Sequence, residues 1–199
     1  MSVCTRKRFA AMQDWPAFTR RASTAVFTAA MAGMVMGDPF AEGTQLGPIS
    51  TESGRDDLVE LVEDAVAKGA TILTGGVVPE GPGFFYPATI IAEVTPAMRV
   101  HLEETFGPVA TLYRVADAEG ALAIANVTDF GLSSAVWTND PDEQARFETE
   151  LEAGAVFVNG MTISYPELPF GGIKNSGFGR ELAAAGIREF CNLKTVWER

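Results

Sequence analysis

Cysteine and histidine, two residue types that often act as nucleophiles, bases or metal ligands, are scarce in this chain. The only examples are Cys4, Cys191 and His101. Two cysteines so far apart do not build a disulfide framework, and a zinc site needs clustered cysteine and histidine ligands. We therefore expect no metal site. We interpret Cys191, between Phe190 and Asn192, as a small buried hydrophobic residue.

Two short segments contain residue types that could bind a ligand. The first runs from Glu103 to Val109 (EETFGPV) and the second from Pro169 to Glu181 (PFGGIKNSGFGRE). Each also has an ordinary structural explanation, because Gly107-Pro108 can form a turn before a strand and a glycine-rich loop needs no ligand. The second segment does not match the G-x-G-x-x-G fingerprint that follows a strand, so we do not interpret it as a phosphate-binding loop.

Together and in this order, the two segments resemble those of the aldehyde dehydrogenase superfamily. Supporting matches are Gly37-Asp38-Pro39, Leu46-Gly47-Pro48, Phe85-Tyr86-Pro87-Ala88-Thr89, Phe130-Gly131-Leu132-Ser133-Ser134 and Gly154-Ala155-Val156-Phe157-Val158-Asn159. The resemblance covers roughly residues 27 to 199, and residues 154 to 199 are most similar to the succinate-semialdehyde dehydrogenase branch. It implies the carboxy-terminal, catalytic-domain portion of such an enzyme.

The resemblance implies NAD(P)-dependent oxidation of an aldehyde, here succinate semialdehyde, to a carboxylic acid. In this family a cysteine thiolate forms a thiohemiacetal, a hydride passes to the nicotinamide, and water hydrolyses the resulting thioester. By the same resemblance, Glu104 would accept hydrogen bonds from the nicotinamide ribose and Phe106 would pack near the ring. The alternative for Glu104 is a solvated acid in the last turn of a helix. The cofactor implied by the resemblance is NAD or NADP, and the residues that distinguish them lie in the family's dinucleotide-binding sheet.

Cys4 is the candidate nucleophile, again by resemblance. Ser2-Val3-Cys4-Thr5 followed by Lys7-Arg8-Phe9 is similar to the family's catalytic stretch, although the spacing to the basic pair is one residue short. The alternative is a cysteine in a frayed terminus, which lacks the electropositive setting of a reactive thiolate. For the substrate, Ser164 lies where the family contacts the aldehyde's tail and would hydrogen-bond a distal carboxylate. A serine in a polar turn is the alternative.

The family's general-base glutamate, oxyanion-hole asparagine and dinucleotide-binding sheet precede the cysteine, and three residues leave no room for them. We therefore expect a truncated chain without dehydrogenase activity of its own, since an activated water and an oxyanion donor would be lacking. The competing hypothesis is a non-catalytic remnant, or an oligomerisation module that pairs with full-length aldehyde dehydrogenase.

Charge and hydropathy argue against two kinds of partner. A formal net charge of -11 repels a phosphate backbone, so we expect no nucleic-acid binding. The uncharged stretch 22–37 is shorter than the roughly 20 residues that a membrane span requires. We expect a buried or amphipathic helix there, no membrane association, and a cytoplasmic protein.

The periodicity of apolar residues predicts an α/β fold with a mostly parallel open sheet and helices on both faces. Helices are expected over 55–68, from the cap Asp117 to about Val127, and from the cap Asp140 to Glu152. Strands are expected over 70–74, 88–94, 109–115, 133–138 and 155–159. We expect an atypical segment over 1–26, the catalytic domain over 27–189, and a strand over 190–199 that joins a second subunit in a homo-oligomer.

Overall fold

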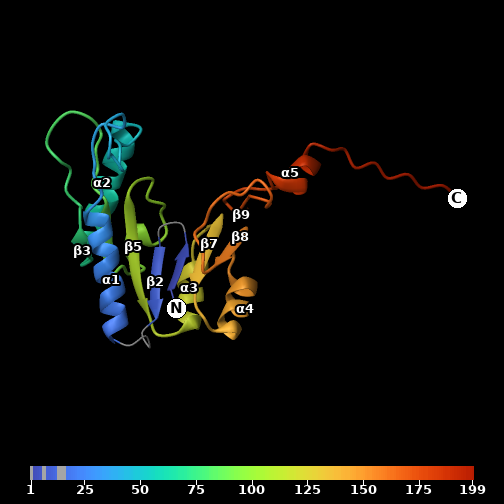
Figure 1. Cartoon of the computed structure of the whole chain (residues 1–199), viewed down its shortest axis with the longest axis horizontal. Coiled ribbons are helices and arrows are strands. Elements are labelled where there is room, and N and C mark those ends of the chain that lie inside the picture. The colour runs from blue at the N-terminus through green and yellow to red at the C-terminus, as the bar shows by residue number, and fades with distance from the viewer. Residues whose placement is uncertain (1, 6–7, 13–16) are drawn as a thin grey trace. The chain divides into compact units, whose positions relative to one another are not determined.

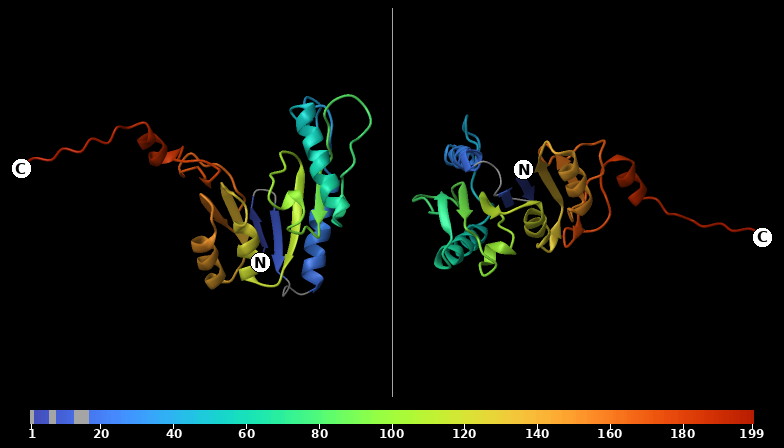
Figure 2. Two further views of the ribbon diagram at one scale, coloured as in Figure 1. Left: turned by 180° about the vertical axis from the view of Figure 1, so that it is seen from behind. Right: turned by 90° about the horizontal axis from the view of Figure 1, so that it is seen from below.

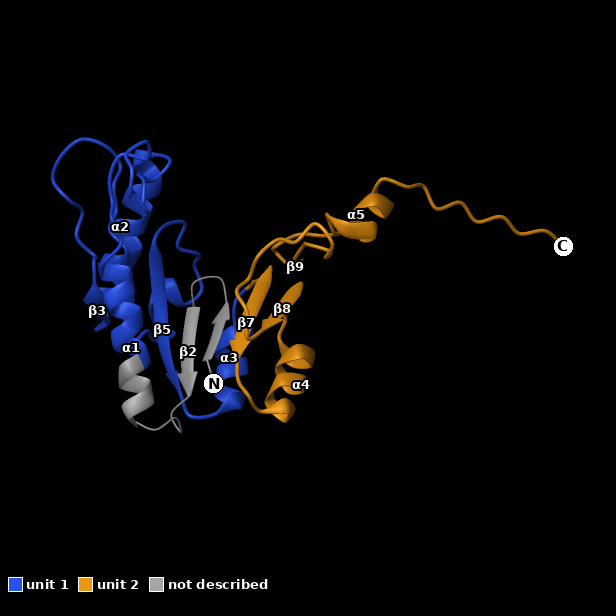
Figure 3. Cartoon of the chain, in the orientation of Figure 1, with its two compact units in different colours: residues 1–128 blue, residues 129–199 orange. Residues whose placement is uncertain are grey.

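The computed structural model describes residues 2–5, 8–12 and 17–199, with side chains from residue 23 onward. The chain forms two compact units, which we call unit 1 (residues 1–128) and unit 2 (residues 129–199) (Figure 3). Both units combine strands with helices, as the α/β prediction requires.

Unit 1 contains a mixed sheet with the strand order β3-β4-β5-β2-β1 (Figure 1). The strands are β1 (Ser2–Thr5), β2 (Arg8–Met12), β3 (Thr71–Thr74), β4 (Thr89–Ala92) and β5 (Val109–Val115). The central strand β5 pairs in parallel with both β4 and β2. The pairs β3–β4 and β1–β2 are antiparallel. The predicted parallel sheet therefore holds at the centre of the unit and changes direction on both sides.

Four helices accompany this sheet: α1 (Ala17–Ala32), α2 (Glu52–Ala67), the 3-10 helix η1 (Arg99–His101) and α3 (Ala118–Asn126). Helix α1 packs against β3 and β4, and α2 lies on the opposite face of these strands (Figure 2). The expected covering of both sheet faces is confirmed for this unit.

The local signals for α2 explain where it begins and ends. The Thr51 hydroxyl accepts a hydrogen bond from Gly54 N at 3.0 Å, so the helix starts three residues before the predicted Arg55. Gly69 follows the helix with a φ of 97°, the left-handed conformation that glycine adopts without strain. Helix α2 therefore ends at Ala67, one residue before the predicted end at residue 68.

The apolar spacing in the sequence predicts one buried face of α2, made of Leu58, Val59, Val62, Ala65 and Val66. Leu58, Val62 and Ala65 are buried as expected and Val59 is half-buried, but Val66 is 48% exposed and Leu61 is buried instead. A helix turns by about 100° per residue, so Leu61 lies about 60° to one side of Leu58 and Val66 about 80° to the other side, and the buried face is shifted toward Leu61.

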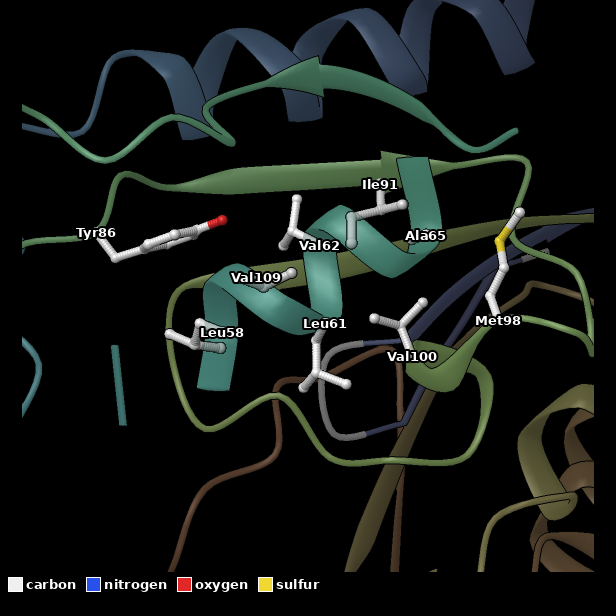
Figure 4. Close-up of a cluster of buried hydrophobic side chains, with 9 residues drawn as sticks. All are labelled: Leu58, Leu61, Val62, Ala65, Tyr86, Ile91, Met98, Val100 and Val109. Carbon is white, nitrogen blue, oxygen red and sulfur yellow. The ribbon is translucent and has the colours of Figure 1, made fainter. Parts of the chain in front are cut away.

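The α2 face contributes four residues to a hydrophobic core cluster of unit 1 (Figure 4). The members of this core are Leu58, Leu61, Val62, Ala65, Tyr86, Ile91, Met98, Val100 and Val109. Because β4, β5, η1 and α2 all contribute side chains, the core fixes the segment between η1 and β5 against α2.

The uncharged stretch 22–37 is only partly helical, since α1 ends at Ala32. Within α1, the residues over 23–32 alternate between half-buried and exposed positions at helical spacing. The helix is therefore not fully buried in the single chain. Its exposed positions hold alanine and valine whereas its half-buried positions include Ser23, Thr24 and Thr28, so the burial pattern does not confirm an amphipathic helix either. Among the helices of the described chain, none has the length and apolar character to cross a bilayer.

Unit 2 contains two small pairs of strands and two helices. In chain order, they are β6 (Phe130–Gly131), β7 (Ser133–Trp137), α4 (Pro141–Glu150), β8 (Ala155–Val158), β9 (Ile173–Lys174) and α5 (Ala183–Glu189). Strands β7 and β8 are parallel, and β6 and β9 are antiparallel. Asp140 caps α4 as predicted, accepting hydrogen bonds from Asp142 N and Glu143 N.

The C-terminal tail over 192–199 forms no strand within the described chain and leaves α5 as an extended segment (Figure 1). Its side chains are exposed. A strand needs a neighbour for its backbone N–H and C=O groups, and the single chain offers this segment none. The oligomerisation strand therefore stays a prediction.

Candidate functional site

The residues Glu103 to Pro108, which we call the EETFGP turn, connect η1 to β5 in unit 1. Thr105 is buried, and its hydroxyl donates a hydrogen bond to Val109 O at 3.2 Å. Gly107 N donates to Thr105 O at 2.9 Å. Glu104 is half-buried and Phe106 is 72% exposed. The turn thus holds an aromatic ring in solvent next to a carboxylate.

The start of this turn is connected to α2 through Arg99, which pairs with Glu103 and hydrogen-bonds to Asp64. The Arg99 guanidinium donates to both carboxylate oxygens of Glu103, at 2.7 and 2.8 Å, and Arg99 N donates to Asp64 Oδ2 at 2.8 Å. The Lys68 ammonium lies 2.6 Å from Asp64 Oδ1. The hydrogen bonds from Arg99 lower the pKa of Glu103 below its usual range. The pKa of Asp64 is also lowered, mainly by the hydrogen bond from the Lys68 ammonium and then by the one from the Arg99 backbone N–H.

His101 belongs to the core and not to a binding site. It is 5% exposed, its Nδ1 lies 3.3 Å from the Tyr113 hydroxyl, and the two rings meet edge to face at 5.8 Å. Across the part of the chain that the structure describes, no three His, Cys, Asp or Glu side chains are grouped so as to hold a metal ion.

The two cysteines have different positions. Cys4 lies in β1, where its backbone is paired with that of Phe9 in β2. The Cys4 side chain lies outside the described residues, so its role as nucleophile stays a prediction. Cys191 was expected to be buried, and this is wrong because it is exposed. The chain leaves the packed part of unit 2 directly after α5, so no apolar surface covers the Cys191 thiol, which donates to Ile187 O at 3.5 Å.

The segment Pro169 to Glu181, which we call the glycine loop, is closed by its own backbone. Phe170 and Glu181 exchange two hydrogen bonds, Phe170 N to Glu181 O at 2.8 Å and Glu181 N to Phe170 O at 2.7 Å. Within the loop, Arg180 Nη1 donates to Gly172 O at 2.9 Å and to Gly179 O at 2.7 Å. These bonds make the loop a braced structure whose shape does not depend on a ligand.

The glycines of this loop are needed for space as well as for conformation. A Cβ atom on Gly171 would lie 2.6 Å from Gly179 O, and one on Gly172 would lie 2.4 Å from Ser176 Cβ. A Cβ atom on Gly154, just before β8, would lie 1.8 Å from Gly171 O, so the loop packs against the start of β8 without any intervening side chain. Gly177 and Gly179 have φ values of 117° and 68°. Packing and backbone geometry therefore account for these glycines without a bound ligand.

The segment Gly160 to Leu168, which we call the exit loop, follows β8 and contains Ser164. All residues over 161–169 are exposed, Ser164 included. The exposed serine is accessible to a ligand, but its side chain is not held in a fixed direction by burial. Ser164 therefore stays a prediction as a substrate contact.

The predicted site residues fall in both units: Cys4, Glu104 and Phe106 in unit 1, and Ser164 in unit 2. The structure brings Glu104 and Phe106 together on one turn. Sequence reasoning missed Arg99, whose pairing with Glu103 at i, i+4 spacing is the kind of signal that could have revealed it.

Comparison with known proteins agrees with this arrangement. Residues 17–196 match the model of the aldehyde dehydrogenase family. A protein named succinate-semialdehyde dehydrogenase (NADP(+)) 1 from Mycobacterium ulcerans is 53% identical over 197 residues, which is 98% of this chain and 42% of that protein. Succinate-semialdehyde dehydrogenase (NADP(+)) from Mycobacterium avium is 56% identical over 171 residues, 86% of this chain and 36% of that protein.

Solved structures show the same similarity. Succinic semialdehyde dehydrogenase from Streptococcus pyogenes, in complex with NADP+, is 32% identical with a TM-score of 0.88, covering 96% of this chain and 41% of that one. NAD-dependent aldehyde dehydrogenase from Sinorhizobium meliloti is 33% identical with a TM-score of 0.86, covering 92% of this chain and 36% of that one. The chain therefore spans about two fifths of the length of these relatives.

A family model that matches nearly the whole chain, with high identity to individual members, confirms the resemblance that the EETFGP turn and the glycine loop indicated. The chain belongs to the aldehyde dehydrogenase family.

Proposed function

We propose that this protein takes part in the NADP-dependent oxidation of succinate semialdehyde to succinate. The observation that carries the proposal is its 53% identity, over 98% of the chain, to a succinate-semialdehyde dehydrogenase whose name specifies NADP(+). The chain spans 42% of that relative, so the activity of the whole enzyme is inferred for this protein by similarity.

The EETFGP turn fits the nicotinamide end of such a cofactor. A carboxylate is purely an acceptor of hydrogen bonds, which suits Glu104 to the paired hydroxyls of a ribose. An aromatic ring that stays 72% exposed, as Phe106 does, offers its face to another flat ring. When bound, the cofactor supplies the acceptor for the hydride that leaves the substrate carbon.

The remaining chemistry is assigned to the nucleophile and the exit loop. The Cys4 thiolate would attack the aldehyde carbon, and a water molecule would later release the acid from the thioester. Ser164 would donate a hydrogen bond to the distal carboxylate of the semialdehyde. Such a bond to a charged group is stronger than one between neutral groups and would favour this substrate over an uncharged aldehyde.

NADPH binding to the purified chain tests the cofactor assignment directly, with NADPH fluorescence as the readout. We expect Phe106→Ala to raise the dissociation constant by about tenfold, because the lost aromatic contact is worth about 1.4 kcal/mol. Phe40→Ala is the matched control, since Phe40 is 97% exposed in the same unit. Equal binding by the Phe106→Ala and Phe40→Ala variants would contradict the assignment.

The chemistry is tested by NADPH formation from succinate semialdehyde and NADP+. The control is Cys4→Ala, which removes the proposed nucleophile. Any turnover by the unmodified chain above that control would support Cys4 and would refute the expectation that the chain is inactive on its own. A preference for succinate semialdehyde over an uncharged aldehyde that disappears in Ser164→Ala would support the substrate contact.

A second copy of the chain is the proposed partner of the C-terminal tail. Within the tail, Leu193, Val196 and Trp197 are 95%, 69% and 78% exposed. Exposed apolar side chains on an extended segment favour addition to a sheet of another subunit. Light scattering after size exclusion should give a lower mass for Trp197→Asp than for the unmodified chain. Phe40→Asp, which adds the same charge in unit 1, should leave the mass of the assembly unchanged.

A further inference from the structure

Gly107 in the EETFGP turn has no room for a side chain. A Cβ atom on Gly107 would lie 2.1 Å from Leu58 Cδ1, and 3.2 Å from both Leu58 Cδ2 and Cγ. The φ of Gly107 is not in the left-handed region that favours glycine. Glycine is therefore required at this position because of Leu58, and not because of the backbone conformation.

Leu58 cannot easily move aside. It is 1% exposed and belongs to the core cluster with Leu61, Val62 and Val109 (Figure 4). Close-packed cores resist an added methyl group, because neighbouring side chains already occupy the space. The turn must therefore move if Gly107 gains a side chain.

The other end of the turn is also attached to α2. Glu103 is held by the Arg99 guanidinium, and Arg99 N donates to Asp64 in α2 at 2.8 Å. Between these two attachments, Thr105 is 7% exposed and Phe106 is 72% exposed. Helix α2 thus supports the turn on both sides of Glu104 and Phe106.

We propose that Leu58 is a positioning residue, which sets through its contact with Gly107 how far the EETFGP turn stands from α2. The consequence for NADPH rests on the proposed function, because Glu104 and Phe106 are assigned to the cofactor there. Leu58 itself is in the core and touches no ligand. Leu58 affects NADPH binding only by setting the position of the EETFGP turn.

The proposal is tested by adding a methyl group at Gly107 and then removing side-chain volume at Leu58. Gly107→Ala should displace the turn and weaken NADPH binding by about tenfold, the effect of overpacking by one methyl group. Adding Leu58→Ala should open the space that the new methyl group needs. The double variant should then bind NADPH within about threefold of the unmodified chain, although it is less stable than the unmodified chain because Leu58→Ala removes buried apolar volume.

Two controls separate positioning from a general loss of stability. Leu61→Ala also removes a buried leucine from α2, but the atoms nearest to a Cβ on Gly107 all belong to Leu58. Adding Leu61→Ala to the Gly107→Ala variant should therefore not restore NADPH binding. Gly37→Ala adds a methyl group in the same unit, 3.5 Å from the Thr44 hydroxyl, and should leave NADPH binding unchanged. Should Leu58→Ala prevent folding, Leu58→Val removes less volume and is expected to give partial restoration.

Hydrogen exchange of the peptide over 102–108 gives a readout that does not depend on NADPH. Gly107→Ala should accelerate exchange in this peptide, and the double variant should slow it again. Such restoration in a chain that does not bind NADPH would uphold the positioning role of Leu58 while refuting the proposed cofactor site. Failure of Leu58→Ala to restore either exchange or binding, in a folded double variant, would overturn the inference.

Discussion

The side-chain amide of Asn159 pairs with the backbone of Thr138 through two hydrogen bonds. Thr138 N donates to Asn159 Oδ1, and Asn159 Nδ2 donates to Thr138 O, both at 3.0 Å. Asn159 follows β8 and has a φ of 54°, a conformation that asparagine tolerates better than most residues. The amide extends the parallel pairing of β7 and β8 by one step and fixes the point at which the exit loop begins.

Asn159→Ala should lower the free energy of unfolding by about 1 to 2 kcal/mol, since it removes two hydrogen bonds and places alanine at a positive φ. Urea unfolding gives this value. Asn175→Ala is the comparison, because Asn175 is exposed and its side chain makes no hydrogen bond with any described residue. Equal free energies of unfolding for Asn159→Ala and Asn175→Ala would show that the Asn159–Thr138 hydrogen bonds do not stabilise the protein.

Tyr86 offers a test of an unpaired buried hydroxyl. It is 1% exposed, and its hydroxyl has no hydrogen-bond partner among the described residues. Burial raises the pKa of Tyr86 to about 12, and the Thr89 hydroxyl partly offsets this rise. That hydroxyl is itself committed, as it donates to Pro87 O and accepts from Gly76 N.

Tyr86→Phe should therefore raise the free energy of unfolding by up to about 1 kcal/mol, because it removes a group that loses its water without gaining a partner. Tyr113→Phe should lower it by about 1 kcal/mol, because Tyr113 is also buried but is hydrogen-bonded to His101. Denaturant titration of both variants decides the matter. Equal losses in the two variants would mean that the Tyr86 hydroxyl has a partner in solution.

Arg99 makes stability depend on pH through Glu103. The guanidinium lowers the folded-state pKa of Glu103 below its ordinary value of 4.5. The resulting stabilisation is present above pH 4.5 and is lost as pH falls through the lowered pKa. Arg99→Gln should therefore be less stable than the unmodified chain near neutral pH, and the difference should vanish in acid.

Urea unfolding between neutral pH and pH 3 measures this difference. In a Glu103→Gln background, the same Arg99→Gln change should give a smaller pH-dependent effect, because the carboxylate ion pair that Arg99 then retains is the longer one to Glu60, at 3.5 Å. A difference that persists unchanged below the lowered pKa would show that Arg99 stabilises the protein by contacts other than its charge.

Gly154→Ala should be among the most damaging single-methyl changes in unit 2. The new methyl group would lie 1.8 Å from Gly171 O, a backbone atom that can move only with the glycine loop. We expect a loss of about 3 kcal/mol or more. We also expect faster proteolysis within the glycine loop, measured by limited digestion.

Gly160→Ala provides the matched control in the same unit. Its Cβ would have no atom closer than Val158 O at 3.9 Å, and its φ is not in the left-handed region. We expect an effect within about 0.5 kcal/mol. A Gly160→Ala chain as unstable as Gly154→Ala would refute the steric explanation.

Much of the fold follows from local signals in the sequence. Strand β5 has the predicted bounds Val109 to Val115, and Asp117 and Asp140 cap the two predicted helices. These elements have a clear apolar pattern together with a capping side chain close by in sequence. The antiparallel pairs β1–β2 and β6–β9 were not predicted, because each strand is short and its partner, not its own pattern, defines it. Helix α5 was not predicted either, since its start at Leu182 has a φ of 62° and no capping side chain.

In the candidate site, too, local sequence signals predict some features, and contacts between residues distant in the chain determine the others. Glu104 and Phe106 could be proposed from one short motif, and the structure places them on one turn. The contacts that hold this turn, Gly107 with Leu58 and Arg99 with Asp64, join residues far apart in the chain. A hydrophobic period or a capping signal does not encode such pairs, so only the three-dimensional packing of α2 reveals them.

The exposed position of Trp197 gives the protein a natural optical reporter. An indole ring in water emits at longer wavelength than one enclosed by protein, and Trp197 is 78% exposed at the end of the chain. If a neighbouring subunit covers the tail, tryptophan emission should shift toward the blue as concentration rises. The difference between the unmodified chain and Trp197→Phe would isolate that signal, so association could be followed without any attached dye.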